Sequence, residues 1–213
     1  MNELWNELAA SGGVTLSPQQ HDLLNRYLDG LIEKNQVMNL TRITDRPGAE
    51  IKHVADALTL LPHLPAAAGR RSLLQVADVG TGGGIPGVIL AIARPDTIVT
   101  LIDATKKKLD AVQGICEAIG VKNVRTVHSR AADVGLTFDV VVARAVGELQ
   151  TLVDWCHGLL RPKSAMLAMK GPRAVEELEA AGRLIRKLRM TAEIIDVARP
   201  ELPGHVIVKL KAR

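Results

Sequence analysis

The chain has 213 residues, of which 47% are hydrophobic and 23% charged, and its formal net charge at neutral pH is +4. This length fits one globular domain with an appendage rather than two full domains. No apolar run approaches the roughly 20 residues of a membrane-spanning helix, and the first residues lack the order of a secretory signal. Two cysteines without a Cys-x-x-Cys pair cannot form a disulfide framework. We therefore expect a soluble, cytoplasmic protein.

The positive charge is concentrated near the C-terminus. Residues 151–213 hold 12 Lys and Arg against 7 Asp and Glu, whereas residues 1–150 hold 15 against 16. This surplus favours an anionic partner. The whole chain contains four aromatic residues, which argues against modules such as the RRM and OB folds, because those stack bases on several exposed rings.

Residues 1–65 are expected to form an N-terminal helical extension packed on the core. Ser17, Pro18 and Gln20 match a capping box with proline at the first helical position, which predicts a helix that ends near Asn35. Apolar residues at helical spacing predict a second helix over about 47–61. The Pro-, Ala- and Gly-containing segment 62–71 is expected to link this extension to the rest of the chain.

In residues 66–213, short apolar strands alternate with amphipathic helices, a pattern typical of a parallel sheet with helices on both faces. The strands are expected at 73–79, 98–103, 124–127, 140–143 and 165–169, and around Ile194 and Val206. The helices are expected near 85–93, 106–119, 149–160 and 175–188. The predicted fold class is therefore α/β, a doubly wound, mostly parallel, seven-stranded Rossmann-like sheet.

A glycine-rich run, Asp78 to Gly87, follows the first predicted strand and opens the first helix after it. Glycines let the backbone turn sharply and approach a ligand, and in open α/β sheets ligands bind beyond the carboxyl ends of the strands. The spacing of Asp78, Gly80, Gly82 and Gly84 matches the first motif of class I methyltransferases, which predicts a site for S-adenosylmethionine (AdoMet). A P-loop would need Gly-Lys-Ser/Thr. A nicotinamide fingerprint starting at Gly82 and a purely structural turn are the alternatives.

Further candidates stand at the ends of the later strands. Asp103 ends the second strand, where a carboxylate can accept hydrogen bonds from both ribose hydroxyls of a nucleoside; a solvated helix cap is the alternative. Ala131 and Ala132 follow the third strand, where backbone groups are expected to hold the adenine. Arg144 and Lys170 end the fourth and fifth strands and are expected to position the reactants, and Arg144 also to contact the cofactor.

Three consecutive lysines, Lys106, Lys107 and Lys108, occupy the first turn of a predicted helix, where cations oppose the helix dipole. We expect them to contact phosphates, with a solvated charged face as the alternative. His53 and Asp56 share a helix face and could hydrogen-bond to each other or contact the cofactor. No histidine stands at a metal-ligand spacing from a cysteine or an acid, so no metal site is expected.

Taken together, these segments resemble the bacterial small-subunit ribosomal RNA (guanine-N7) methyltransferases, known as the RsmG or GidB family. The resemblance extends over nearly the whole chain, and the order and spacing of its motifs are far more specific than the glycine run alone. Two positions depart from the family pattern: Ala57 replaces a frequent serine, and Ala132-Asp133 replaces a frequent pair of acids. The motifs are Asn39-Leu40-Thr41, His53-x-x-Asp56, the glycine run, Asp103 with the lysines after it, Ser129-Arg130, Arg144-Ala145, Trp155 and Lys170-Gly171.

The resemblance implies a class I methyltransferase that uses AdoMet and methylates N7 of one guanine in the 16S ribosomal RNA, free or in the 30S particle. Arg199 joins the three lysines as an expected RNA contact. An AdoMet enzyme for a small molecule and a non-catalytic RNA-binding assembly factor stay open beside this prediction, and the chain is expected to act as a monomer away from membranes. The implied cofactor contacts are Gly80, Ile85, the Ala131-Ala132 backbone and Arg144.

Overall fold

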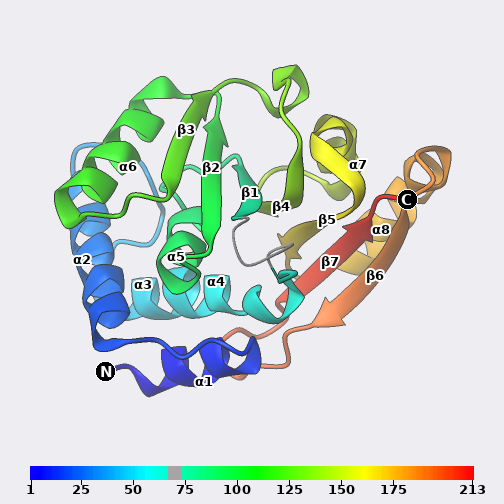
Figure 1. Cartoon of the computed structure of the whole chain (residues 1–213). Helices are drawn as coiled ribbons and strands as arrows, with labels where there is room; N and C mark the ends of the chain where they lie inside the picture. Colours follow the sequence, from blue (N-terminus) through cyan, green and yellow to red (C-terminus); the bar gives the residue numbers. More distant parts are fainter. Residues whose placement is uncertain (67–72) are drawn as a thin grey trace.

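The computed structural model describes residues 1–66 and 73–213 and shows a seven-stranded sheet between helices (Figure 1). The order of the strands across the sheet is β3-β2-β1-β4-β5-β7-β6, and β7 alone runs antiparallel to its neighbours. The predicted α/β fold class is therefore confirmed. The strands are β1 (Leu74–Val79), β2 (Thr97–Asp103), β3 (Val124–His128), β4 (Phe138–Arg144), β5 (Leu160–Lys170), β6 (Thr191–Asp196) and β7 (Val206–Lys211).

The strand order places a ligand site between β1 and β4. The chain moves outward from β1 through β2 to β3, then returns to the other side of β1 to form β4. Ligands of open α/β sheets bind at such a switch point, beyond the carboxyl ends of the strands. The sheet also differs from the nicotinamide-binding order 3-2-1-4-5-6, because β7 enters antiparallel between β5 and β6.

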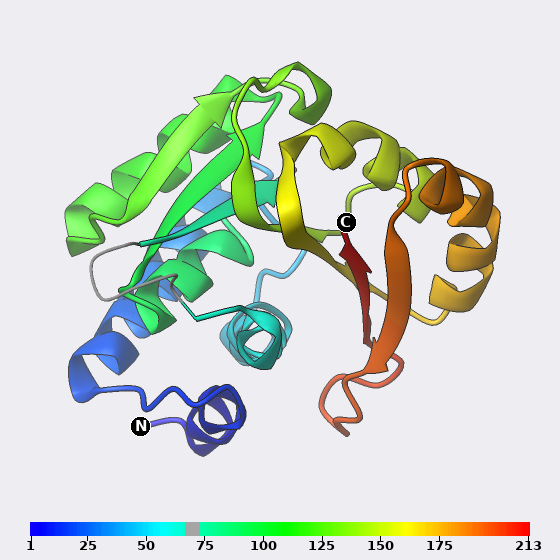
Figure 2. The same ribbon diagram turned by 45° about the vertical axis from the view of Figure 1, so that its right-hand side comes forward.

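Helices cover both faces of the sheet (Figures 1 and 2). Side chains alternate along each strand: Val76 and Val140 belong to the hydrophobic cluster on one face, Ala77 and Val141 to the cluster on the other. The first cluster includes residues of α5 and α6, and the second includes residues of α7 and α8. The helices are α1 (Glu3–Ser11), α2 (Pro18–Asn35), α3 (Arg46–Ala49), α4 (Asp56–Leu58), α5 (Gly87–Ala93), α6 (Lys106–Ile119), α7 (Leu149–Cys156) and α8 (Ala174–Lys187).

The helices of residues 1–65 pack against the first face of this sheet. The capping box at Ser17 is formed in both directions with Gln20, and α2 begins at Pro18 as predicted. Helix α2 lies beside α6 at the left of Figure 1. Buried residues such as Trp5 and Leu24 share one hydrophobic cluster with the sheet. The second half of the expected linker 62–71 falls on residues 67–71, which lie outside the described residues.

Two predicted helices differ from the observed ones. The helix expected over 47–61 contains a six-residue π-helical segment, η1 (Glu50–Ala55), and α4 after it ends at Leu58. Apolar spacing cannot distinguish the wider π turn from an α turn. The helix expected over 149–160 ends at Cys156 and continues as a 3₁₀ turn, and β5 starts at Leu160, five residues before its expected start at residue 165.

Two further findings concern the chain as a whole. Across residues 1–66 and 73–213, every helix is too short or too polar to cross a lipid bilayer. Cys116 and Cys156 are both free and buried, and burial raises the pKa of each thiol to about 12. Each cysteine therefore serves packing rather than chemistry.

Candidate active site

A cleft of about 1280 Å³ opens at the carboxyl edge of the sheet. It lies at the switch point between β1 and β4, where the fold predicts a ligand. One wall comes from the N-terminal part of the chain, through residues 39–44 and the segment η1. The glycine loop after β1 and the ends of β4 and β5 supply the rest, together with residues 205–207 at the start of β7.

Asp78 shapes the glycine loop from behind. Its side chain is fully buried, and its Oδ2 accepts hydrogen bonds from the Thr81 hydroxyl at 2.6 Å and the Gly87 amide at 2.8 Å. Burial raises the pKa of the carboxyl to about 7. This carboxylate is not among the groups that line the cleft and holds both ends of the loop together, and the predicted contact of Asp78 with the cofactor stays a prediction.

The glycines of the loop have different neighbours. Gly84 has a φ of +75°, and a Cβ there would collide with the Tyr27 hydroxyl. Gly82 has a φ of +54°, but a Cβ there would meet only the Leu40 carbonyl oxygen at 3.7 Å and one loop carbonyl at 3.9 Å. Gly84 is therefore needed for packing, whereas Gly82 faces the open cleft, where a ligand can approach its backbone.

Tyr27 connects helix α2 to this loop. It is completely buried, and its hydroxyl donates a hydrogen bond of 2.5 Å to the carbonyl oxygen of Gly83. Burial raises the pKa of Tyr27 well above its usual value, so the hydroxyl keeps its proton. Sequence reasoning missed this contact, because helical spacing does not show which loop a helix covers.

The predicted cofactor residues fall into two groups. Gly80, Gly82, Ile85 and Arg144 line the cleft. Asp103, Ala131 and Ala132 lie beside it at the ends of β2 and β3, and they are not among the residues that line it. The Asp103 carboxylate accepts hydrogen bonds from the Gly82 amide at 3.0 Å and the Thr105 amide at 2.8 Å, so it is held against the glycine loop.

Arg144 at the end of β4 points back to the N-terminal wall. Its Nη1 lies 3.3 Å from Asp56 Oδ2, and its Nη2 lies 3.2 Å from His53 Nδ1. Nδ1 of His53 also lies 3.1 Å from the Lys52 carbonyl oxygen, and its Nε2 lies 2.9 Å from the Thr41 hydroxyl, so both ring nitrogens contact polar groups of the protein. Burial and the neighbouring Arg144 lower the pKa of His53 to about 4, so this ring is neutral at pH 7.

Asp56 lies at the centre of these contacts. It is 3% exposed, and its second oxygen, Oδ1, lies 3.0 Å from Nδ1 of His205, just before β7. The hydrogen bond to Asp56 raises the pKa of His205. Asp56 thus joins the N-terminal wall to both β4 and β7. His205 belongs to no motif, and sequence reasoning missed it.

Lys170 lines the cleft, but its ammonium group is already hydrogen-bonded to other groups of the protein. Its Nζ donates to the Gly147 carbonyl and to Glu177 Oε2, both at 2.7 Å, and its side chain is 8% exposed. Burial acts to raise the pKa of Glu177, but the hydrogen bonds from Lys170 and the Leu149 amide, together with the positive charges of Lys170 and Arg173, lower it. Lys170 therefore holds the loop after β4 in place, and its expected contact with the reactants stays a prediction.

The four cations expected to bind RNA do not come together. Lys108 lines the cleft, whereas Lys106 pairs with Asp110 on the exposed side of α6. Arg199 pairs with Glu7 of α1 and lines a second, smaller cavity of about 190 Å³. Lys107 is exposed and does not line the cleft. Their sequence positions alone could not show this separation.

Comparison with known proteins gives the family. The model of the GidB family, described as rRNA small subunit methyltransferase G, matches residues 20–201. The chain belongs to this family. A ribosomal RNA small subunit methyltransferase G of Sorangium cellulosum is 42% identical over 212 residues, covering 97% of this chain and 86% of that protein. Its counterpart in Lactobacillus delbrueckii subsp. bulgaricus is 37% identical over 213 residues, covering 97% and 87%.

Solved structures agree on the fold. The ribosomal protein L11 methylase of Lactobacillus delbrueckii subsp. bulgaricus is similar to this chain with a TM-score of 0.57 and 16% identity. The match covers 76% of this chain and 79% of that protein. At this identity the likeness concerns the Rossmann-like methyltransferase fold alone, and the GidB-family match carries the assignment.

Proposed function

We propose that this chain transfers the methyl group of AdoMet to N7 of a guanine in 16S ribosomal RNA, acting as a monomer on the 30S particle. The observation that carries the proposal is the cleft at the switch point, which the glycine loop borders in a chain of the rRNA small subunit methyltransferase G family.

The residues around the cleft fit AdoMet. Gly82 leaves its side of the loop open, and Asp103 at the end of β2 is held beside it, where a carboxylate suits ribose hydroxyls. We assign the adenine to the backbone of Ala131 and Ala132, and the methionine end to the cleft beside Arg144. When bound, AdoMet supplies an electrophilic methyl group on a sulfonium sulfur.

Guanine N7 carries a free lone pair and no proton, so its attack on a methyl group requires no general base. The site is consistent with this chemistry. His53, a natural candidate for a base, has one ring nitrogen facing Arg144 and the other bound to Thr41. The protein has to align the reactants, and correct alignment can contribute up to roughly 7 to 11 kcal/mol.

The position of the acceptor atom decides how the RNA must present its base. Guanine N7 lies in the deep major groove of A-form RNA, which side chains cannot enter. The target base must therefore come from a loop or leave its stack, as in other enzymes that act on bases.

The direct test is incubation with labelled AdoMet and 30S subunits from a strain that lacks this gene, followed by nucleoside analysis. We expect label in 7-methylguanosine at one position. Binding of RNA without methyl transfer would identify an assembly factor, and label on a small molecule only would identify a different enzyme. Either result would refute the proposal.

The pH dependence of the single-turnover rate tests the acceptor atom separately. If N7 attacks without a base, the rate stays nearly flat between about pH 6 and 8.5. A general-base mechanism would instead lower the rate about tenfold per pH unit below the pKa of the base. A slope of this kind, or label on an amine or a ribose hydroxyl, would show that N7 is not the acceptor atom.

A further inference from the structure

The cleft carries a surplus of positive charge. Two of its cations are neutralised in place, because Arg144 pairs with Asp56 and Lys170 pairs with Glu177. Glu148 is the remaining acid among the described residues that line the cleft. The remaining cations of the lining are Arg42, Lys52, Lys108 and Arg173.

This surplus does not suit the cofactor. AdoMet has a sulfonium cation, and its amino and carboxylate groups cancel, so the molecule is itself positively charged at neutral pH. Like charges in a cleft repel more strongly than in water, because the protein walls lower the dielectric constant. The free cations therefore indicate a second ligand that is anionic.

Three of these cations stand on two sides of the opening. Arg42 lies in the segment after α2 and Lys52 in the π-helical segment, both on the N-terminal wall. Arg173 lies on the β5 side, at the residue that precedes α8. All three are exposed, and none has an ion-pair partner among residues 1–66 and 73–213.

We propose that Arg42, Lys52 and Arg173 form a phosphate clamp across the opening of the cleft, which holds the RNA backbone on both sides of the base to be methylated. This proposal rests on the proposed function, since it assumes RNA as the anionic ligand. Cations on opposite walls would fix the backbone at two points and leave the base between them directed into the cleft. Phosphate contacts of this kind set register and orientation rather than sequence preference.

The clamp differs from the RNA contacts expected from sequence. Lys106 and Arg199 already have acidic partners, Asp110 and Glu7, whereas the three clamp residues are free to bind phosphate. Their positions in the sequence are far apart, and only the fold brings them to one opening. None of the three belongs to a motif that sequence reasoning singled out for RNA.

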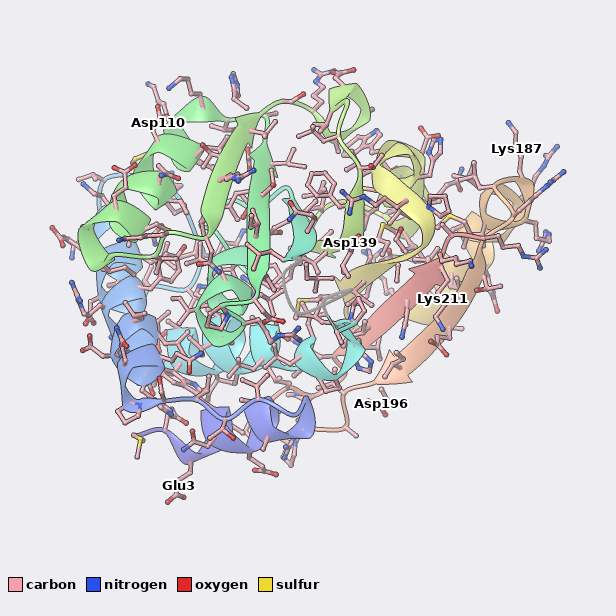
Figure 3. All side chains as sticks on the ribbon, in the orientation of Figure 1. Glu3, Asp110, Asp139, Lys187, Asp196 and Lys211 are labelled. Carbon is pink, nitrogen blue, oxygen red and sulfur yellow. The ribbon has the colours of Figure 1, made fainter. Side chains whose placement is uncertain are left out.

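The test compares two triple variants that remove the same charge. The clamp variant carries Arg42→Gln, Lys52→Gln and Arg173→Gln, and the control carries Lys163→Gln, Arg186→Gln and Lys187→Gln. The control residues are exposed and have no ion pair among the described residues. Figure 3 shows Lys187 pointing outward, far from Glu3 of α1. Binding of unmethylated 30S subunits is measured at several salt concentrations, and binding of AdoMet by calorimetry.

For the clamp variant we expect at least a tenfold weaker affinity for 30S subunits. Its salt slope should be smaller by about 2, because each phosphate that the protein no longer neutralises lowers the slope by about 0.7 to 0.9. Its affinity for AdoMet should change less than twofold, and the control variant should resemble the wild type in both measurements.

An unchanged slope, an equally weakened control, or a parallel weakening of AdoMet binding would overturn the clamp. If the wild-type protein binds 30S subunits without methylating them, the proposed function is refuted. The salt slopes of the two variants then still decide whether the clamp exists.

Discussion

At the scale of single residues, the carboxylate of Asp103 has two sets of hydrogen-bond partners. It accepts hydrogen bonds from the Gly82 and Thr105 amides, and the proposed function adds the two ribose hydroxyls of AdoMet. A carboxylate offers about four acceptor positions, so the four bonds can coexist. The helix cap weighed from sequence is not formed, because α6 has no side-chain cap and Asp103 binds only the amide of Thr105, the residue before the helix.

We predict that Asp103→Ala weakens AdoMet binding by about 2 kcal/mol, or roughly 30-fold, because the cofactor loses charged hydrogen bonds. Calorimetry measures the affinity, and far-UV circular dichroism checks the fold. Asp110→Ala, which removes an exposed acid of helix α6, is the control and should bind AdoMet like the wild type. Equal AdoMet affinities of the two variants would show that Asp103 does not bind the cofactor.

His53 makes the free energy of unfolding depend on pH. The unfolded imidazole takes up a proton near pH 6.5, whereas the folded one does so only near 4. Between these values the unfolded state binds more protons, so acidification favours unfolding in this range, and the effect is absent above pH 6.5.

We therefore predict that His53→Gln reduces the loss of unfolding free energy between pH 6.5 and 4, by up to about 3 kcal/mol. Urea denaturation at several pH values measures the difference between the variant and the wild type. His63→Gln is a control, since its pKa is also lowered but it lies outside the network of Arg144. Parallel pH profiles for His53→Gln and wild type would contradict the burial of a neutral ring at this position.

At the scale of elements, helix α2 and the glycine loop form one unit. Tyr27 reaches from the helix to the Gly83 carbonyl, and its hydroxyl fills the space that a side chain at Gly84 would need. The loop therefore takes its shape from a helix about 50 residues earlier in the chain. Through this contact the helical extension supports the loop of the proposed cofactor site.

We predict that Tyr27→Phe lowers the free energy of unfolding by about 1 to 3 kcal/mol, because the buried Gly83 carbonyl loses its donor. AdoMet affinity should fall as well, since the loop is no longer held. Thermal unfolding with and without AdoMet measures both effects. Thr59→Val, which removes another buried hydroxyl but lies outside the loop, should lower stability and leave AdoMet binding intact. Normal AdoMet binding by the Tyr27→Phe variant would show that helix α2 does not support the cofactor site.

Local patterns predicted most of the elements. Helix α6 has the predicted bounds, and the strands of the parallel part lie where short apolar runs predicted them, because both signals depend on neighbours in sequence. The π-helical segment Glu50–Ala55 and the early start of β5 could not be foreseen. Both depend on tertiary contacts, the first with Arg144 and the second with β4.

The site was predicted less completely than the fold. Gly80, Gly82 and Arg144 all line the cleft, because strand ends of a parallel sheet meet at one edge. The burial of Asp78 and the pairing of Lys170 with Glu177 were not foreseen. A charged residue at a strand end has the same sequence pattern whether it faces a ligand or a neighbouring acid.

At the scale of the whole molecule, we propose that the extension of residues 1–65 is part of the core and not an independent domain. Buried side chains of its helices, among them Leu24 and Leu58, lie in one cluster with Val76 and Val140 of the sheet. Without these helices the first face of the sheet would expose a large apolar surface, which folded monomers rarely tolerate.

We predict that a chain starting at residue 66 does not unfold cooperatively and binds a hydrophobic dye, as partly folded states do. A chain starting at Val14 is the comparison. It loses α1 with the buried Trp5 and the Glu7 partner of Arg199, and should stay folded with a stability lower by at least about 3 kcal/mol. Calorimetry on both chains gives the result. A cooperative transition in the shorter chain would show that the sheet folds without the extension.

Because Tyr27 contacts the glycine loop, it can serve as a spectroscopic probe of the proposed cofactor site. Tyr27 is the single tyrosine of the chain. Biosynthetic labelling with fluorotyrosine therefore introduces one fluorine, buried behind Gly83, and a fluorine NMR spectrum would contain one resonance from the folded protein. Movement of the loop on binding AdoMet would shift this resonance, whereas phosphates held at the opening of the cleft would not. The resonance would thus follow the binding of AdoMet alone, even in a sample that also contains RNA.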